Sequence, residues 1–279
     1  MRSVFATAVA AWACAACAAG AVELAPGKTI EFVVTGTQPS LADLKRVTNA
    51  KSVQMAVKLP DNYSPDRSFP VVIFLSGGDG GNGCELHMAT PFMGGTDYIL
   101  CNMPVFKQNL EGATVDEQLS VTPLDAEYAL QAYRVLIDEL HRLVPNIDDS
   151  RSVLGGFSNG AGSAALFLWA GDQDLLARFS SFVLVEGGFW LASDRPDPTS
   201  SLRFKPATFA GLAGKRVLVM YGAQTHPADR IPFIKDARKT IEALRQAGVD
   251  TAEMPMTDVG HDFPPEAMAK ARQWVLSGR

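Results

Sequence analysis

The sequence lacks the features that would tie it to nucleic acid. It has 25 Lys and Arg residues against 30 Asp and Glu, a formal net charge of −5, and its basic residues form no cluster. A polyanion would therefore find no attractive face on this protein, and we expect no nucleic-acid partner. No internal repeat and no low-complexity tract follows the alanine-rich first 20 residues.

Long apolar runs are also missing after that leader, so we expect no membrane span. In the leader, Arg2 is followed by the apolar stretch Val4–Ala13 and then by small residues. This stretch is too short to cross a bilayer, which favours a secretory signal peptide over a transmembrane anchor. We expect residues 1–20 to be removed and residues 21–279 to form one secreted or periplasmic domain. A lipid anchor at Cys17 is an alternative, because small residues precede it, although the usual leucine is absent.

Cysteine is scarce. Of four cysteines, Cys14 and Cys17 lie in the leader, so only Cys84 and Cys101 remain after export. In an oxidising compartment two cysteines predict one disulfide, worth ~3 kcal/mol, and two free buried thiols are the alternative. The segment from Cys84 to His87 has no second ligand pair, so we expect no metal site.

Apolar segments separated by turns predict a sheet. Two segments alternate or are β-branched, as antiparallel or edge strands are: Thr29–Val34 and Ser52–Leu59. Four continuous apolar runs are typical of strands buried on both faces of a parallel sheet, and the last of them is weaker: Pro70–Leu75, Ser181–Val185, Val217–Tyr221 and Tyr98–Met103.

Helical spacing of apolar residues fills the segments between these strands. One predicted helix begins after Thr122-Pro123 and ends before Pro145, another contains Ala237 and stops at Gly248, and a last one contains Met268. Strands that alternate with helices predict a single α/β domain with a doubly wound, mostly parallel sheet and helices on both faces. Ligands of such sheets bind beyond the carboxyl ends of the strands.

The most informative segment is Val153–Gly162, which is a short apolar strand followed by Gly-x-Ser-x-Gly. Gly156 and Gly160 flank Ser158, so the backbone can turn sharply from strand into helix and hold the hydroxyl exposed. An incidental serine in a glycine-rich turn is the alternative. The strand before Ser158 and the helix after it favour a nucleophile.

Donors for an oxyanion are expected on both sides of this serine. The helix behind Ser158 has free N–H groups at its start, that of Asn159 first. The apolar run Pro70–Leu75 ends in a glycine-rich loop, and Gly77 and Gly78 there have no side chains to block an approaching oxyanion. We therefore expect the oxyanion hole to comprise Asn159 and Gly78.

The same loop also matches the Gly-x-Gly-x-x-Gly pattern of dinucleotide sites, at Gly78, Gly80 and Gly83. That pattern requires a helix directly behind it and an acid at the end of the next strand. Met88–Gly95 is a poor helix, and the next strand ends in Asn102 without an acid. We therefore expect no nucleotide cofactor.

Two carboxylates compete for the role of orienting a histidine. Asp229 is the acid of the loop that follows the strand Val217–Tyr221, and we take it as first choice, although it also suits a helix N-cap. Glu186 is the rival, because it ends its own buried strand, where a charge is rarely idle, yet it could simply pair with a cation.

The general base is expected to be His261. It lies in a glycine-hinged loop between the last strand and the last helix, a position that none of the other three histidines occupies. The resulting order of serine, acid and histidine along the chain is the order that accompanies the Gly-x-Ser-x-Gly turn.

At these residues the chain resembles the secreted esterase group of α/β-hydrolases, which includes proteins similar to polyhydroxybutyrate depolymerases and feruloyl esterases. The resemblance rests on Leu59–Leu75, on Asn146–Arg151 with the serine turn behind it, and on Gly260-His261. Two departures stand out. The family usually has His-Gly-Gly in its oxyanion loop, and Ser76 takes the place of that histidine. The family's acid commonly follows its strand as Gly-x-x-Asp, but Thr225 stands at that place, and Asp229 lies further on, as if displaced by a small insertion.

The resemblance implies an α/β-hydrolase catalytic domain that transfers an acyl group to water with no metal or organic cofactor. His261 would deprotonate Ser158 as its Oγ attacks a small-molecule or polymeric ester, and Asp229 would hold the imidazole. Trp190 could line the substrate pocket, although a core position suits it equally.

Two other functions stay open on the sequence: an exported serine peptidase of the same fold, and a hydrolase-fold protein that binds without turnover. Neither the ester nor the oligomeric state follows from the sequence.

Overall fold

The computed structural model describes residues 22–34, 54–78, 85–105, 123–189, 209, 211–224 and 230–278. The predicted leader with Cys17 and three candidate residues, Cys84, Trp190 and Asp229, lie outside the described residues.

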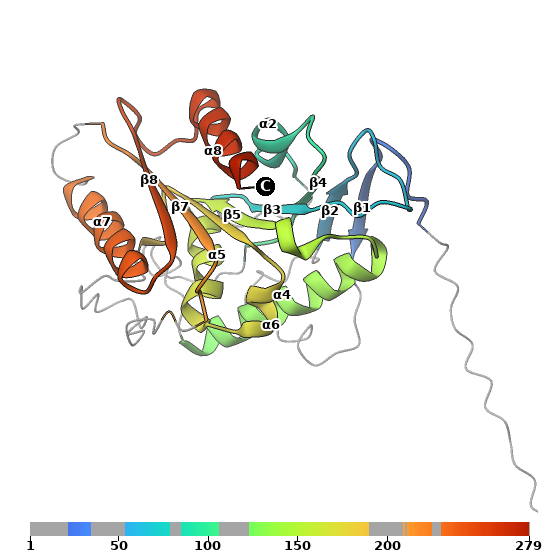
Figure 1. Cartoon of the computed structure of the whole chain (residues 1–279), viewed down its shortest axis with the longest axis horizontal. Helices are drawn as coiled ribbons and strands as arrows, with labels where there is room; N and C mark the ends of the chain where they lie inside the picture. Colours follow the sequence, from blue (N-terminus) through green and yellow to red (C-terminus); the bar gives the residue numbers. More distant parts are fainter. Residues whose placement is uncertain are drawn as a thin grey trace, which may run out of the picture.

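A single eight-stranded sheet runs through the molecule in the order β1-β2-β4-β3-β5-β6-β7-β8 (Figure 1). β2 pairs antiparallel with both of its neighbours, β1 and β4, and all the other pairings are parallel, so β4, β3, β5, β6, β7 and β8 form a parallel sheet. The strands are β1 (Thr29–Val33), β2 (Gln54–Lys58), β3 (Val71–Leu75), β4 (Ile99–Asn102), β5 (Val153–Phe157), β6 (Ser181–Val185), β7 (Arg216–Gly222) and β8 (Asp250–Met256). The predicted mostly parallel α/β sheet is therefore confirmed.

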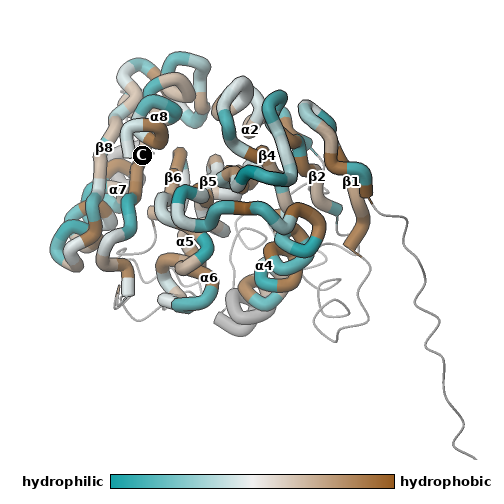
Figure 2. The backbone as a smooth tube through the Cα atoms, turned by 45° about the vertical axis from the view of Figure 1, so that its right-hand side comes forward, coloured by the Kyte–Doolittle hydropathy of each residue, from teal (hydrophilic) through white to brown (hydrophobic). Residues whose placement is uncertain are grey.

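Helices cover both faces of this sheet. Figure 1 shows α2 and α8 above it, with α4, α5 and α6 below. The described helices are α2 (Ala89–Met93), α4 (Pro123–Leu143), the 3-10 turn η1 (Asp149–Arg151), α5 (Asn159–Ala170), α6 (Gln173–Ala177), α7 (Arg230–Gln246) and α8 (Pro265–Ser277). In Figure 2 polar and apolar residues alternate along α4, as expected of a helix that buries one side.

The strand period of two divides the apolar side chains between two cores. On β3, Ile73 packs into the core beneath α4, α5, α6 and α7, whereas its neighbour Phe74 packs into the core under α2 and α8. Because every residue of β3 is buried, this strand reads as a continuous apolar run in the sequence.

The short helix α2 was not expected. Met88–Gly95 reads as a poor helix, yet α2 forms over Ala89–Met93. No side chain caps its start, but Arg272 of α8 donates hydrogen bonds to the carbonyl oxygens of Pro91 and Phe92. Packing against α8 therefore outweighs weak local propensity.

The structure does not support the predicted Cys84–Cys101 disulfide, because Cys101 is free and fully buried on β4. Strand alternation turns its side chain into the core on the α4 side of the sheet, beside Ile99. Burial raises the pKa of the Cys101 thiol well above its usual range, because the apolar core disfavours a thiolate.

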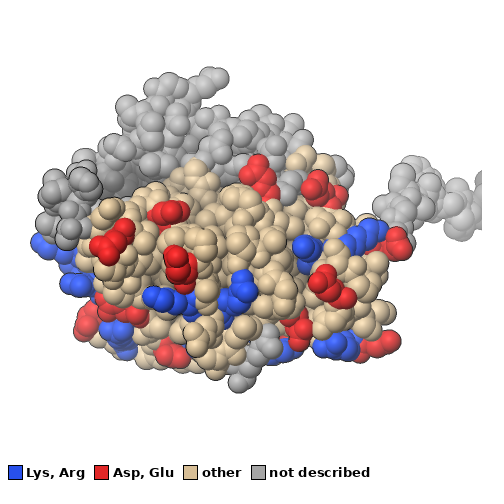
Figure 3. All heavy atoms as spheres, turned by 90° about the horizontal axis from the view of Figure 1, so that it is seen from above, with Lys and Arg blue, Asp and Glu red and all other residues tan. Residues whose placement is uncertain are grey.

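The described surface agrees with the charge balance of the sequence. On the face in Figure 3, acidic and basic side chains are interspersed over the described residues. None of the described helices is both long and apolar enough for a bilayer crossing.

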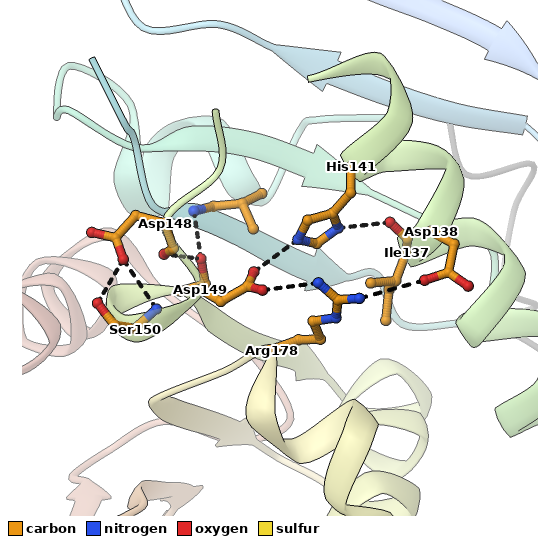
Figure 4. Close-up of polar contacts among 9 residues, drawn as sticks. Ile137, Asp138, His141, Asp148, Asp149, Ser150 and Arg178 are labelled. Atoms are coloured by element: carbon orange, nitrogen blue, oxygen red, sulfur yellow. Dashed lines mark hydrogen bonds and ion pairs between the residues drawn. The ribbon is translucent and has the colours of Figure 1, made fainter. Parts of the chain in front are cut away.

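A cluster of charged side chains joins α4 to the segments before β5 and after α6 (Figure 4). His141 places Nδ1 2.8 Å from the Ile137 carbonyl and Nε2 2.8 Å from Asp149 Oδ1. The other oxygen of Asp149 accepts from Arg178 at 3.1 Å, and Arg178 also lies 3.7 Å from Asp138. Asp149 is thus the acceptor that two half-buried donors share.

We expect Asp149→Ala to lower the free energy of unfolding by about 1–3 kcal/mol, because it leaves His141 and Arg178 without their shared acceptor. Chemical denaturation followed by circular dichroism measures this. Arg142→Ala is the matched control on α4. It removes an ion pair to Glu139 whose Arg side chain is 65% exposed, and it should leave the midpoint nearly unchanged. Equal losses in the two variants would contradict the assignment.

Candidate active site

Ser158 occupies a sharp turn between β5 and α5. Its backbone has φ 55° and ψ −117°, a conformation that a residue with a side chain adopts only at a cost. Two hydrogen bonds hold it there: the Ser158 N–H donates to Val185 O at 2.8 Å, and Gly162 N–H donates to Ser158 O at 3.0 Å. The predicted strand, turn and helix around Ser158 are all present.

The glycines beside Ser158 are required by close approach of the backbone. A Cβ on Gly160 would lie 2.1 Å from the Leu75 carbonyl oxygen, and one on Gly156 would lie 2.3 Å from the carbonyl carbon of Gly160. Any side chain at these positions would push α5 away from β3 and β5. The glycine pattern of the sequence therefore reflects how tightly α5 starts against the sheet.

His261 reaches this turn from the loop between β8 and α8. Its Nε2 lies 2.9 Å from Ser158 Oγ, within hydrogen-bond distance of the hydroxyl. Half of the His261 side chain is exposed. The structure thus brings together the predicted nucleophile and the predicted base, which are 103 residues apart in the sequence.

Glu186 lies behind His261 at the end of β6. Its side chain is completely buried, and Oε2 lies 2.9 Å from His261 Nδ1. Its other carboxylate oxygen accepts a hydrogen bond from the N–H of Gly222 at the end of β7. A buried carboxylate is costly unless it is hydrogen-bonded, and Glu186 has partners for both oxygens.

The carboxylate beside His261 is therefore the alternative acid named from the sequence. Asp229, the first choice, lies outside the described residues, and α7 begins at the next residue, Arg230. His261 Nδ1 already faces Glu186. The signal for Glu186 in the sequence was a charge at the end of an apolar run.

Gly222 was missed by the sequence reasoning. Besides donating to Glu186, it approaches the histidine loop so closely that a Cβ on it would lie 2.2 Å from the Gly260 carbonyl oxygen and 2.4 Å from that of Val259. The end of β7 therefore sets the position of both Glu186 and the loop that carries His261. A glycine at the end of a buried strand was the only signal for this role.

The glycine loop after β3 packs on the serine turn. A Cβ on Gly77 would lie 2.9 Å from Phe157 Cδ1 and 3.1 Å from Ser158 Cβ, and Gly78 has φ +74°. The Asn159 side chain donates to the Gly78 carbonyl oxygen at 2.7 Å. Gly77 thus packs on Ser158, and the two residues predicted for the oxyanion hole, Asn159 and Gly78, are hydrogen-bonded to each other.

The other sequence candidates are placed as follows. Trp190 lies outside the described residues, directly after Phe189, which is buried and 6.5 Å from Tyr221 between ring centroids. Among the described residues, no group of three or more His, Cys, Asp or Glu side chains could hold a metal ion. A cavity of about 280 Å³ lies near the start of β4, at the other end of the parallel strands from Ser158, and its lining includes Lys58, Asp61 and Asp97.

Comparison with known proteins identifies the fold. The sequence matches no family model and no curated protein. Its structure is similar to an esterase from Rhizomucor miehei (18% identity, 91% of this chain and 85% of that one, TM-score 0.57) and a carboxylesterase from Bacillus cereus (20%, 87% and 100%, 0.55). It is also similar to part of a protein described as a dipeptidyl aminopeptidase IV from Bacteroides ovatus (11%, 90% and 36%, 0.56). The chain therefore has the α/β-hydrolase fold.

We expect Gly160→Ala to lower the free energy of unfolding by several kcal/mol, about 3 or more, because the methyl group meets the Leu75 backbone. Gly248→Ala is the control: it has φ +79° and open space around it, so it should cost about 1 kcal/mol of backbone strain. Denaturant titration of both variants measures the difference. If Gly160→Ala proved no worse than the control, α5 would not be held as tightly against β3 as described.

Proposed function

We propose that this protein with the α/β-hydrolase fold is a serine carboxylic-ester hydrolase. The observation that supports it is the chain of contacts from Ser158 Oγ to His261 Nε2 and from His261 Nδ1 to Glu186 Oε2, each 2.9 Å long. A serine hydroxyl needs an adjacent base to become nucleophilic, and the base needs a third group to fix its orientation. Ser158, His261 and Glu186 meet both requirements.

In the first half of the reaction, Ser158 Oγ attacks the ester carbonyl while His261 Nε2 takes the hydroxyl proton. Glu186 accepts the hydrogen bond from Nδ1–H, so the lone pair of the neutral imidazole stays on Nε2, facing the serine. When Nε2 takes up the proton, His261 and Glu186 become an ion pair. His261 then gives that proton to the leaving alcohol, which leaves an acyl group on Ser158.

In the second half, water repeats the attack on the acyl group. His261 takes a proton from the water, the carboxylic acid is released, and the proton returns to Ser158 Oγ. The oxyanion of both steps would be bound by the N–H of Asn159, at the start of α5, and by the loop at Gly78. These steps require only side chains, backbone donors and water, so no cofactor is invoked.

An ester is preferred as substrate because two of the similar structures are esterases. The similarity to the peptidase-named structure keeps amide hydrolysis as the second candidate. Binding without turnover is the third, and the intact serine-histidine contact argues against it. We also propose that the protein is exported and that residues 1–20 are removed. A lipid anchor on Cys17 is the alternative to simple removal.

The test is hydrolysis of p-nitrophenyl esters from acetate to octanoate by the mature protein. We expect Ser158→Ala to abolish turnover, by about 10⁶-fold, and Glu186→Gln to lower kcat about 10³–10⁴-fold, since an amide cannot stabilise the imidazolium. Asp229→Asn is the matched control with the same change of charge, and its rate should stay within about 3-fold of wild type.

The opposite result, a collapse in Asp229→Asn with Glu186→Gln active, would assign the acid to Asp229. Peptide substrates assayed in parallel separate the esterase from the peptidase. A wild-type protein that hydrolyses neither class and is not labelled by a fluorophosphonate would refute the hydrolase proposal.

A further inference from the structure

Phe157 contacts both the histidine and the glycine loop after β3, and the reaction scheme gives it no role. Its ring centroid lies 5.0 Å from that of His261 with an angle of 35° between the planes. The same ring also packs on the loop, because a Cβ on Gly77 would lie 2.9 Å from Phe157 Cδ1. Phe157 also precedes Ser158 directly, so one side chain touches the base and the loop and is joined to the nucleophile.

The two hydrogen bonds of His261 restrain one motion of its ring only weakly. Both bonds, to Ser158 Oγ and to Glu186 Oε2, are made by the ring nitrogens in the plane of the ring. They therefore resist a shift of the imidazole along the line that joins Nδ1 and Nε2 more than they resist a tilt of the ring about that line. Half of the His261 side chain is exposed, and the Phe157 ring packs against the imidazole.

We propose that Phe157 is a positioning residue that acts through His261, holding the imidazole ring in line with Ser158. This inference rests on the proposed ester-hydrolase function. It adds a role for the first variable residue of the Gly-x-Ser-x-Gly turn. The role needs an aromatic ring at that position and does not depend on contact with the substrate.

The variants that test it are Phe157→Leu, which keeps apolar bulk without the ring, and Phe157→Tyr, which keeps the ring. We expect Phe157→Leu to lower kcat about 10-fold with KM unchanged, and by the same factor for every ester from acetate to octanoate. Phe157→Tyr should stay within about 3-fold of wild type. The rate of labelling by a fluorophosphonate should follow the same order, because it depends on the same serine and base.

Phe179→Leu is the matched control. Phe179 is a buried aromatic between α6 and the start of β6, packed against Phe167 and Phe182 and remote from the serine turn at the other end of the strands. It should lower the thermal midpoint and leave kcat unchanged. Thermal unfolding of all variants by circular dichroism separates loss of fold from loss of rate.

Three outcomes would overturn the inference. Equal kcat in Phe157→Leu and wild type would show that the aromatic ring does not contribute to the rate. An effect confined to some acyl lengths, or to KM, would make Phe157 a wall of the substrate pocket. A Phe157→Tyr variant as slow as Phe157→Leu would show that the aromatic face is not what matters. In each case wild type still hydrolyses the esters, so the proposed function stands, whereas an inert wild type fails both.

Discussion

The register of the parallel strands β5, β6 and β7 is the constraint on which the rest of the site depends. Phe157 pairs with Val185, and Val185 pairs with Met220. The ladder continues one step further, because Ser158 N–H donates to Val185 O and Glu186 N–H donates to Met220 O. The nucleophile and the carboxylate therefore leave the sheet at the same level on adjacent strands. Both turn away with φ 55°, which is uncommon for residues other than glycine.

That register also explains the glycines of the site. Once the strands end level, α5 begins directly against β3 and β5, and the loop before α8 crosses the end of β7. Gly160 and Gly222 lie at these two crossings, where an added Cβ would meet backbone atoms within 2.2 Å. The two close approaches bring Ser158 and His261 to hydrogen-bond distance although they come from opposite halves of the parallel sheet. Backbone packing thus provides the precision that the half-exposed histidine could not provide alone.

Much of the fold could be predicted from the sequence, because its signals are local. The buried strands appear as continuous apolar runs, and α4 and α8 appear by helical spacing. Short α2 could not be found in this way, since contacts with α8 hold it rather than its own residues. The predicted disulfide fails for a similar reason. Two cysteines are visible in the sequence, but the side of β4 to which the Cys101 thiol points depends on the register of the sheet.

The residues of the site also divide into those with a local signal in the sequence and those placed by contacts between distant segments. Ser158 and His261 carry local signatures, a glycine-flanked turn and a glycine-hinged loop, and the structure places the two side chains within hydrogen-bond distance. The choice between Asp229 and Glu186 depends on which carboxylate reaches His261 Nδ1. That distance depends on how three segments of the chain pack together, which no local pattern encodes. The charge of Glu186 at the end of an apolar strand was nonetheless a physical signal. Burial of a carboxylate is expensive, and a sequence that places one at a strand end needs a partner for it.

The difference in exposure between Glu186 and His261 fits the chemistry proposed for them. The Glu186 side chain is completely buried, so its attraction for a positive imidazole is weakly screened by solvent. His261 is half exposed, so Nε2 can exchange a proton first with Ser158, then with a leaving alcohol and then with water. If both side chains were buried, substrate and water could not reach the base. If both were exposed, the carboxylate would stabilise the imidazolium little. Because Glu186 is buried and His261 is half exposed, the positive charge on His261 can form when Ser158 gives up its proton. That charge can be lost again when His261 passes the proton on.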